Sequence, residues 1–147
     1  MENVTIYAKS SPVLATAKLI IKDFLEVMEK SKVGKKYVSD VFMVGDTEMQ
    51  VEMCPNGGKE DLKGFVSLCL WNLSDTNVTA TCQFVTDART STFKNEVPAK
   101  RGWVYPRFLS HTECTEVYMD KDFVLTANVE IEGEDLKLFG NIPDNCR

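Results

Sequence analysis

The sequence predicts an all-β protein, an antiparallel β-sandwich built from roughly seven short strands. Three observations support this fold class. Segments rich in β-branched and aromatic residues recur along the 147 residues, with turn signals such as Gly45-Asp46 between them. Two of these segments alternate apolar and polar residues with the period of two that a half-buried strand requires. No long segment repeats its apolar residues with the period of an amphipathic helix.

The length of the chain fits a single domain with a sizeable core. Within it we expect a lead-in at residues 1–14, the sandwich at residues 15–132 and a tail at residues 133–147. In the tail, Leu138 and Phe139 are the candidates to dock against the sandwich.

The expected strands differ in how clearly the sequence marks them. Thr47–Cys54 and Phe123–Glu132 alternate cleanly, whereas Phe65–Leu73 is almost continuously apolar, as in a central strand. Four further segments are β-rich but less regular: Ala15–Phe24, Tyr37–Val44, Val78–Thr86 and Phe93–Val97. Leu25–Lys36 is expected to be a loop with some helical character, and Thr112–Val117 is a polar connection.

The densest aromatic cluster in the chain is the stretch Gly102–Leu109, with three aromatic residues and a proline. Such a cluster is typical of a core anchor, a recognition surface, or one element that serves as both. Pro98 cuts the preceding strand because it cannot donate to a sheet ladder, so this edge is expected to curve into a loop. Gly102 is expected to let the backbone of a ligand approach closely.

Charge and composition argue against several classes of function. The net charge of −5 argues against non-specific nucleic-acid binding, which needs a basic surface to neutralise phosphates. No apolar run approaches the roughly 18 residues of a membrane span. Residues 1–5 show no secretory signal, so we expect a cytoplasmic or nuclear protein. The five cysteines include no CxxC motif and are expected to be reduced, without an intramolecular disulfide.

One constellation, His111 with Glu113 and Cys114, has catalytic character. A thiol hydrolase needs an imidazole within hydrogen-bond reach of the sulfur and a third group that orients the ring. Only closeness in sequence supports that geometry, and further ligands at zinc spacing are missing. Asp120 and Asp122 lack the spaced oxygen ligands and central glycine of a calcium loop. The sequence therefore predicts no enzyme, no metal site and no cofactor.

Taken in order, several segments resemble the MATH domain, the meprin and TRAF homology fold. The matching segments are Leu19–Phe24, Tyr37–Gly45, Met49–Gly57, Phe65–Leu70, Gly102–Leu109 and Tyr118–Val129. The resemblance covers roughly residues 15–132 and depends on the order and spacing of these motifs. It implies an antiparallel sandwich of about eight strands. It also implies that the domain binds short extended peptides in a shallow groove and performs no catalysis.

Carried over by position, the resemblance also implies which residues line the groove. They are Cys69 and Trp71 on one strand, Cys82 on the next, and Asn95, Val97, Lys100, Arg101, Gly102, Trp103 and Tyr105. Cys69 and Cys82 replace large aromatic residues of well-studied adaptors, which implies a small, apolar groove floor. Tyr105 is the expected exposed contact, whereas Trp103 either contacts the peptide or closes the end of the sandwich. Lys100 and Arg101 either pair with an acidic ligand or remain solvated loop charges.

The sequence therefore predicts a non-catalytic protein–protein interaction module whose partners are short linear peptide segments. The resemblance adds a role in substrate recognition, as part of a ubiquitin-ligase adaptor. The alternative is a structural, self-associating sandwich in which the aromatic stretch is buried in a subunit interface.

Overall fold

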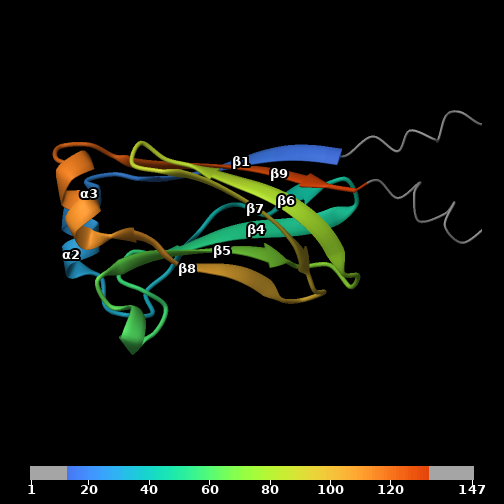
Figure 1. The fold of residues 1–147 in the computed structure, drawn as a ribbon, viewed down its shortest axis with the longest axis horizontal. Coiled ribbons are helices and arrows are strands. Elements are labelled where there is room, and N and C mark those ends of the chain that lie inside the picture. The colour runs from blue at the N-terminus through green and yellow to red at the C-terminus, as the bar shows by residue number, and fades with distance from the viewer. Residues whose placement is uncertain (1–12, 133–147) are drawn as a thin grey trace, which may run out of the picture.

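A computed structural model describes residues 13–132 of the chain. The segments on either side, which include Leu138, Phe139 and Cys146, lie outside the described residues. Two antiparallel sheets face one another across an apolar core, so the predicted β-sandwich is confirmed (Figure 1).

Within residues 13–132, nine strands form the two sheets. Sheet 1 contains β1 (Val13–Ile21), β6 (Val78–Val85), β7 (Thr90–Val97) and β9 (Phe123–Ile131). Sheet 2 contains β2 (Tyr37–Val38), β3 (Phe42–Val44), β4 (Thr47–Cys54), β5 (Phe65–Asn72) and β8 (Gly102–Ser110). The strand order is β1-β9-β6-β7 in sheet 1 and β2-β4-β5-β8 in sheet 2, with β3 also paired to β4. Consequently β7 and β8 each end a sheet, although they follow one another in the chain.

The cleanly alternating segments of the sequence form strands, as predicted. β4 buries Met49, Val51 and Met53 on one face, and β9 buries alternate residues from Phe123 to Ile131. Because each sheet turns one apolar face inward, these side chains meet in a shared core. Each large side chain buried there contributes about 1.5–3 kcal/mol to folding. β5 is buried on both faces for most of its length, as its central place in sheet 2 requires.

Two short helices cover one end of the sandwich (Figure 1). They are α2 (Phe24–Lys30) and α3 (His111–Val117), and a 3-10 turn, η1, spans Glu60–Leu62. α2 lies where a loop with helical character was expected, because Phe24 and Met28 are four residues apart and both reach the core. α3 is not predicted, and its polar sequence shows no apolar period. No helix within residues 13–132 is long and apolar enough to cross a membrane.

Two of the predicted strand boundaries are wrong, for local reasons. β1 ends at Ile21 and not at Phe24, because Asp23 adopts a left-handed φ of 50° and turns the chain into α2. The predicted strand Tyr37–Val44 is interrupted between β2 and β3. There the hydroxyl of Ser39 accepts the N–H of Val51 at 3.0 Å, so a side chain replaces the backbone in the ladder.

Candidate functional site

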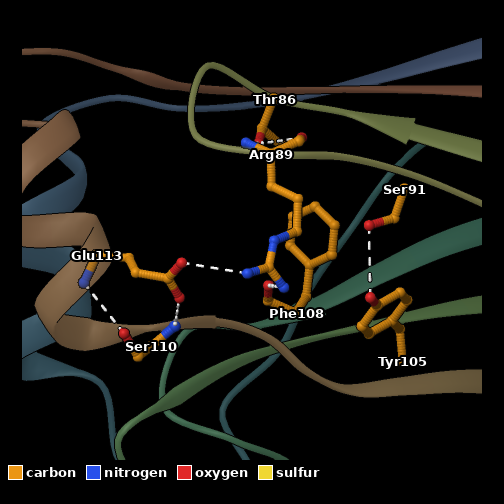
Figure 2. Close-up of polar contacts among 7 residues, drawn as sticks. All are labelled: Thr86, Arg89, Ser91, Tyr105, Phe108, Ser110 and Glu113. Atoms are coloured by element: carbon orange, nitrogen blue, oxygen red, sulfur yellow. Dashed lines mark hydrogen bonds and ion pairs between the residues drawn. The ribbon is translucent and has the colours of Figure 1, made fainter.

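β7 and β8 are the end strands of their sheets, and side-chain contacts bridge the space between them. The bridging pairs are Phe93–Trp103, Ser91–Tyr105 and Arg89–Phe108. The rings of the first pair stack with centroids 3.6 Å apart, and the hydroxyls of the second pair lie 3.4 Å apart. In the third pair, the Arg89 guanidinium donates to the Phe108 carbonyl at 2.9 Å (Figure 2). These contacts tie the two sheet edges together along one side of the sandwich.

Trp103 and Tyr105 both point inward from β8 and are half-buried. The ring of Tyr105 packs edge-on against Phe108 with centroids 5.3 Å apart, and against Trp103 at 5.9 Å. The expectation that Tyr105 is an exposed contact is therefore wrong. Of the two interpretations of Trp103, its stacking on Phe93 favours the one in which it closes the sandwich.

The outer face of sheet 2 brings together another part of the predicted site. Cys69 and Trp71 of β5 lie opposite Val104 and Gly102 of β8. A Cβ atom at Gly102 would lie 2.5 Å from the Cys69 sulfur and 3.1 Å from a ring carbon of Trp71. Trp71 is held in this position because its indole N–H donates to Glu52 at 3.1 Å. The space beside Gly102 on the outer face is therefore filled by these two side chains, and only a glycine fits there without displacing one of them.

Two of the predicted groove residues are inaccessible. Cys82 lies on β6 and is fully buried in sheet 1, whereas Cys69 lies on β5 in sheet 2. The expectation that these cysteines share a groove floor is wrong, because strands that follow one another in a sandwich can belong to opposite sheets. Val97 is also buried, and its carbonyl accepts from the Asn72 side chain at 2.9 Å. Asn95 is exposed on β7.

Lys100 and Arg101 are exposed in the loop between β7 and β8. The Lys100 ammonium donates to the carbonyl of Leu73 at 2.7 Å and lies 3.5 Å from the carboxylate of Asp75. These contacts favour a role for Lys100 in holding the loop. The side chain of Arg101 remains exposed at the start of β8.

The backbone of β8 supplies a feature that reasoning from side chains missed. In an antiparallel ladder, opposed residues alternate between pairs that exchange hydrogen bonds and pairs that do not. The N–H of Asn72 donates to the carbonyl of Arg101, so the odd-numbered residues from Arg101 to Tyr105 are those that bond to β5. The N–H and C=O groups of Gly102 and Val104 therefore point away from β5. No other described strand pairs with β8 on that side.

Val104 also presents an apolar side chain at this edge, with 51% of its surface exposed. A hollow of about 100 Å³ adjoins it on the outer face, with walls that include Leu62, Cys54 and Cys69. Burial raises the pKa of both thiols, that of Cys69 to about 12, so they are neutral, apolar groups near pH 7. The hollow therefore suits one small apolar side chain.

A larger hollow of about 680 Å³ lies between α2 and β2, far along the chain from β8. Charged side chains, among them Lys30, Lys32 and Lys35, make up most of its lining. The end strand beside it, β2, has only two residues, so an extended segment would find little backbone to pair with there. We therefore place the candidate site at the edge of β8.

The three residues considered for thiol catalysis have structural contacts. His111 Nε2–H donates to the carbonyl of Pro55 at 2.7 Å. Cys114 is fully buried, and burial raises its pKa to about 12, which keeps the sulfur protonated at neutral pH. Glu113 caps α3 together with Ser110 and also lies 3.2 Å from Arg89. This arrangement gives the imidazole no thiolate to activate.

The strand order and the packing of the two sheets define the class of the fold, a TRAF-like β-sandwich. A solved structure with a similar fold is that of Notothenia coriiceps TRAF5, with a TM-score of 0.57 and 16% sequence identity. The similarity covers 80% of this chain and 74% of the TRAF5 chain. No family model matches the sequence, and no curated protein matches it.

Proposed function

We propose that this protein is a protein-interaction domain that binds a short extended segment of a partner along β8. The observation that carries the proposal is the strand edge, where the backbone groups of Gly102 and Val104 point outward. A peptide that adds to such an edge forms main-chain hydrogen bonds, and its alternate side chains contact the two faces. The TRAF-like fold and the resemblance to MATH domains support a role in protein binding.

The surroundings of the edge favour a particular kind of segment. The exposed side chain of Val104 and the neighbouring hollow favour a compact apolar side chain in the ligand. We further propose that the domain recognises substrates for a ubiquitin-ligase adaptor in the cytoplasm or nucleus. This role depends on the resemblance to MATH domains.

Two substitutions at Val104 test the peptide site, because only one of them changes the backbone. Linear peptides are selected on the wild-type protein from a displayed random library, and their Kd is measured by calorimetry. Val104→Pro removes an N–H that the ladder with β5 does not use, as edge strands tolerate. We expect it to weaken binding by about 10-fold or more, whereas Val104→Thr keeps the N–H and should change Kd by about 3-fold or less.

Circular dichroism and thermal unfolding establish that both variants are folded before binding is compared. Equal affinity of the wild type and both folded variants would place the peptide site away from β8.

The same edge favours a second candidate function, self-association. Two β8 edges from two copies can pair antiparallel, because each offers both donors and acceptors. Sedimentation equilibrium would then show a dimer that Val104→Pro dissociates. A wild-type protein that is monomeric at the concentrations of the binding experiment would contradict this alternative.

A further inference from the structure

We propose that Arg89 closes one end of the β8 edge, so that a bound segment pairs with Gly102–Tyr105 and ends or bends away beside Pro106. This inference rests on the proposed peptide binding and defines the kind of segment that fits. The partner supplies a short extended segment at a chain end or directly before a turn, and a long continuous strand is excluded.

Arg89 reaches β8 from the turn between β6 and β7 (Figure 2). Its Nη1–H donates to the carbonyl of Phe108 at 2.9 Å, which covers an acceptor of β8. The backbone of Arg89 is fixed by Thr86, whose hydroxyl donates to the Arg89 carbonyl at 2.8 Å and accepts the Arg89 N–H at 3.0 Å. Both ends of this arginine are therefore held, which makes it a stable cover over the strand.

The other half of the guanidinium is held by Glu113, whose carboxylate lies 3.2 Å from Nη2 (Figure 2). That carboxylate also accepts the N–H of Ser110 at 2.8 Å, within the capping box of α3. Because Glu113 balances the charge of Arg89, the pair offers no net positive charge to an acidic ligand. Arg89 therefore covers the strand and does not act as an anion-binding site.

Pro106 removes the next pairing position along the edge. It has no N–H, so it cannot donate to an added strand. Its carbonyl already accepts from the hydroxyl of Ser67 at 2.7 Å, across the irregularity where the register between β5 and β8 shifts. An added strand therefore finds neither a donor nor an uncommitted carbonyl at this residue. Pro106 and the carbonyl that Arg89 covers follow one another along β8, and together they prevent strand pairing toward α3.

The opposite end of the edge is limited by the loop from β7. Lys100 adopts a left-handed φ of 59°, where the chain turns back before β8 begins at Gly102. Between these limits, Gly102 and Val104 keep both backbone groups directed outward. The part of β8 that can pair with an added strand is thus limited at both ends. Side-chain contacts must therefore supply much of the binding affinity.

A series of peptides of increasing length tests this inference. One peptide selected from the displayed random library on the wild-type protein is synthesised with single-residue extensions at each end. For the wild type, we expect extension past Pro106 to change Kd by less than about 2-fold. In Arg89→Met Pro106→Val, which restores a donor and uncovers an acceptor, the same extension should tighten Kd by about 10-fold. Arg107→Ala changes an exposed arginine of the same strand and should behave like the wild type.

The outcomes separate this inference from the proposed function. If extension past Pro106 tightens binding to the wild type, or has no effect in the folded double variant, Arg89 does not limit the site and the inference is overturned. Should the double variant not fold, Arg89→Met alone carries the test, with an expected gain of about 3-fold. If the selected peptides bind the wild type away from β8, or none binds, the proposed function fails and the inference fails with it.

Discussion

Gly102 lies beside Cys69 and against the ring of Trp71 on the outer face of sheet 2, where a Cβ atom would be 2.5 Å from the Cys69 sulfur. Gly102→Ala is expected to destabilise the protein by about 1–3 kcal/mol, because one of the two neighbours must move. Denaturant unfolding measures this loss. Cys69→Ala in the same chain should recover part of it by removing the sulfur. A Gly102→Ala protein as stable as the wild type would contradict this packing.

The described cysteines are expected to behave as inert apolar groups. Burial raises the pKa of Cys69, Cys82 and Cys114 to about 12, and it raises the pKa of Cys54 as well. Because the thiolate is the reactive form, we expect iodoacetamide at pH 8 to label these residues at least about 100-fold more slowly in the folded than in the denatured protein. Site-resolved mass spectrometry measures each rate. Rapid labelling of folded Cys114 would show a reactive thiolate and would contradict this expectation.

α3 is an element whose start depends on one local motif. Ser110 and Glu113 form a reciprocal capping box, with bonds of 3.1 Å and 2.8 Å between side chain and backbone. Ser110→Ala is expected to lower the free energy of unfolding by about 1 kcal/mol, the usual effect of losing an N-cap. Denaturant unfolding tests this value, and Thr115→Ala on the same helix is the control. An unchanged stability of Ser110→Ala would show that packing alone holds α3.

The same capping box gives stability a pH dependence. The N–H of Ser110 is the main cause that lowers the pKa of Glu113 below its ordinary 4.5, and Arg89 adds to the effect. A lowered pKa in the folded state means that the stabilisation is present above pH 4.5. It is lost as the pH falls through the lower folded value. Glu113→Gln removes this titration, so the wild-type and variant stabilities should converge as the pH falls below 4.5.

The elements differ in how far the sequence could predict them, and the difference is physical. β4 and β9 alternate because one face of each is buried, so their period is visible in the sequence. α3 has too few buried residues to show a period, but Ser110 and Glu113 at positions i and i+3 are a signal that could have located it. The placement of Cys69 and Cys82 in different sheets could not be predicted, because pairing in a sandwich is non-local.

The side-chain contacts between β7 and β8 hold the two sheets together beside the candidate site, so losing them should lower the stability of the whole molecule. If Tyr105 were the exposed contact that the sequence predicts, Tyr105→Ala would leave the melting temperature nearly unchanged. The packing of Tyr105 on Phe108 and Trp103 leads us to expect a loss of about 2–4 kcal/mol and a clearly lower melting temperature. Tyr105→Phe removes only the 3.4 Å contact with Ser91 and should stay within about 0.5 kcal/mol of the wild type. If calorimetry finds the same melting temperature for Tyr105→Ala and the wild type, the packing of Tyr105 between the sheets is contradicted.

The proposed partner segment would add to β8 as a further strand, through the outward backbone groups of Gly102 and Val104. Amide hydrogen exchange, resolved by residue in the free and peptide-bound protein, tests this pairing. The N–H groups of Trp103 and Tyr105 already bond to β5, so their protection should change little. We expect a selected peptide to slow exchange at the amides of Gly102 and Val104 by about 10-fold or more. Saturating peptide that leaves both amides unchanged, or that protects another edge such as β1, would contradict it.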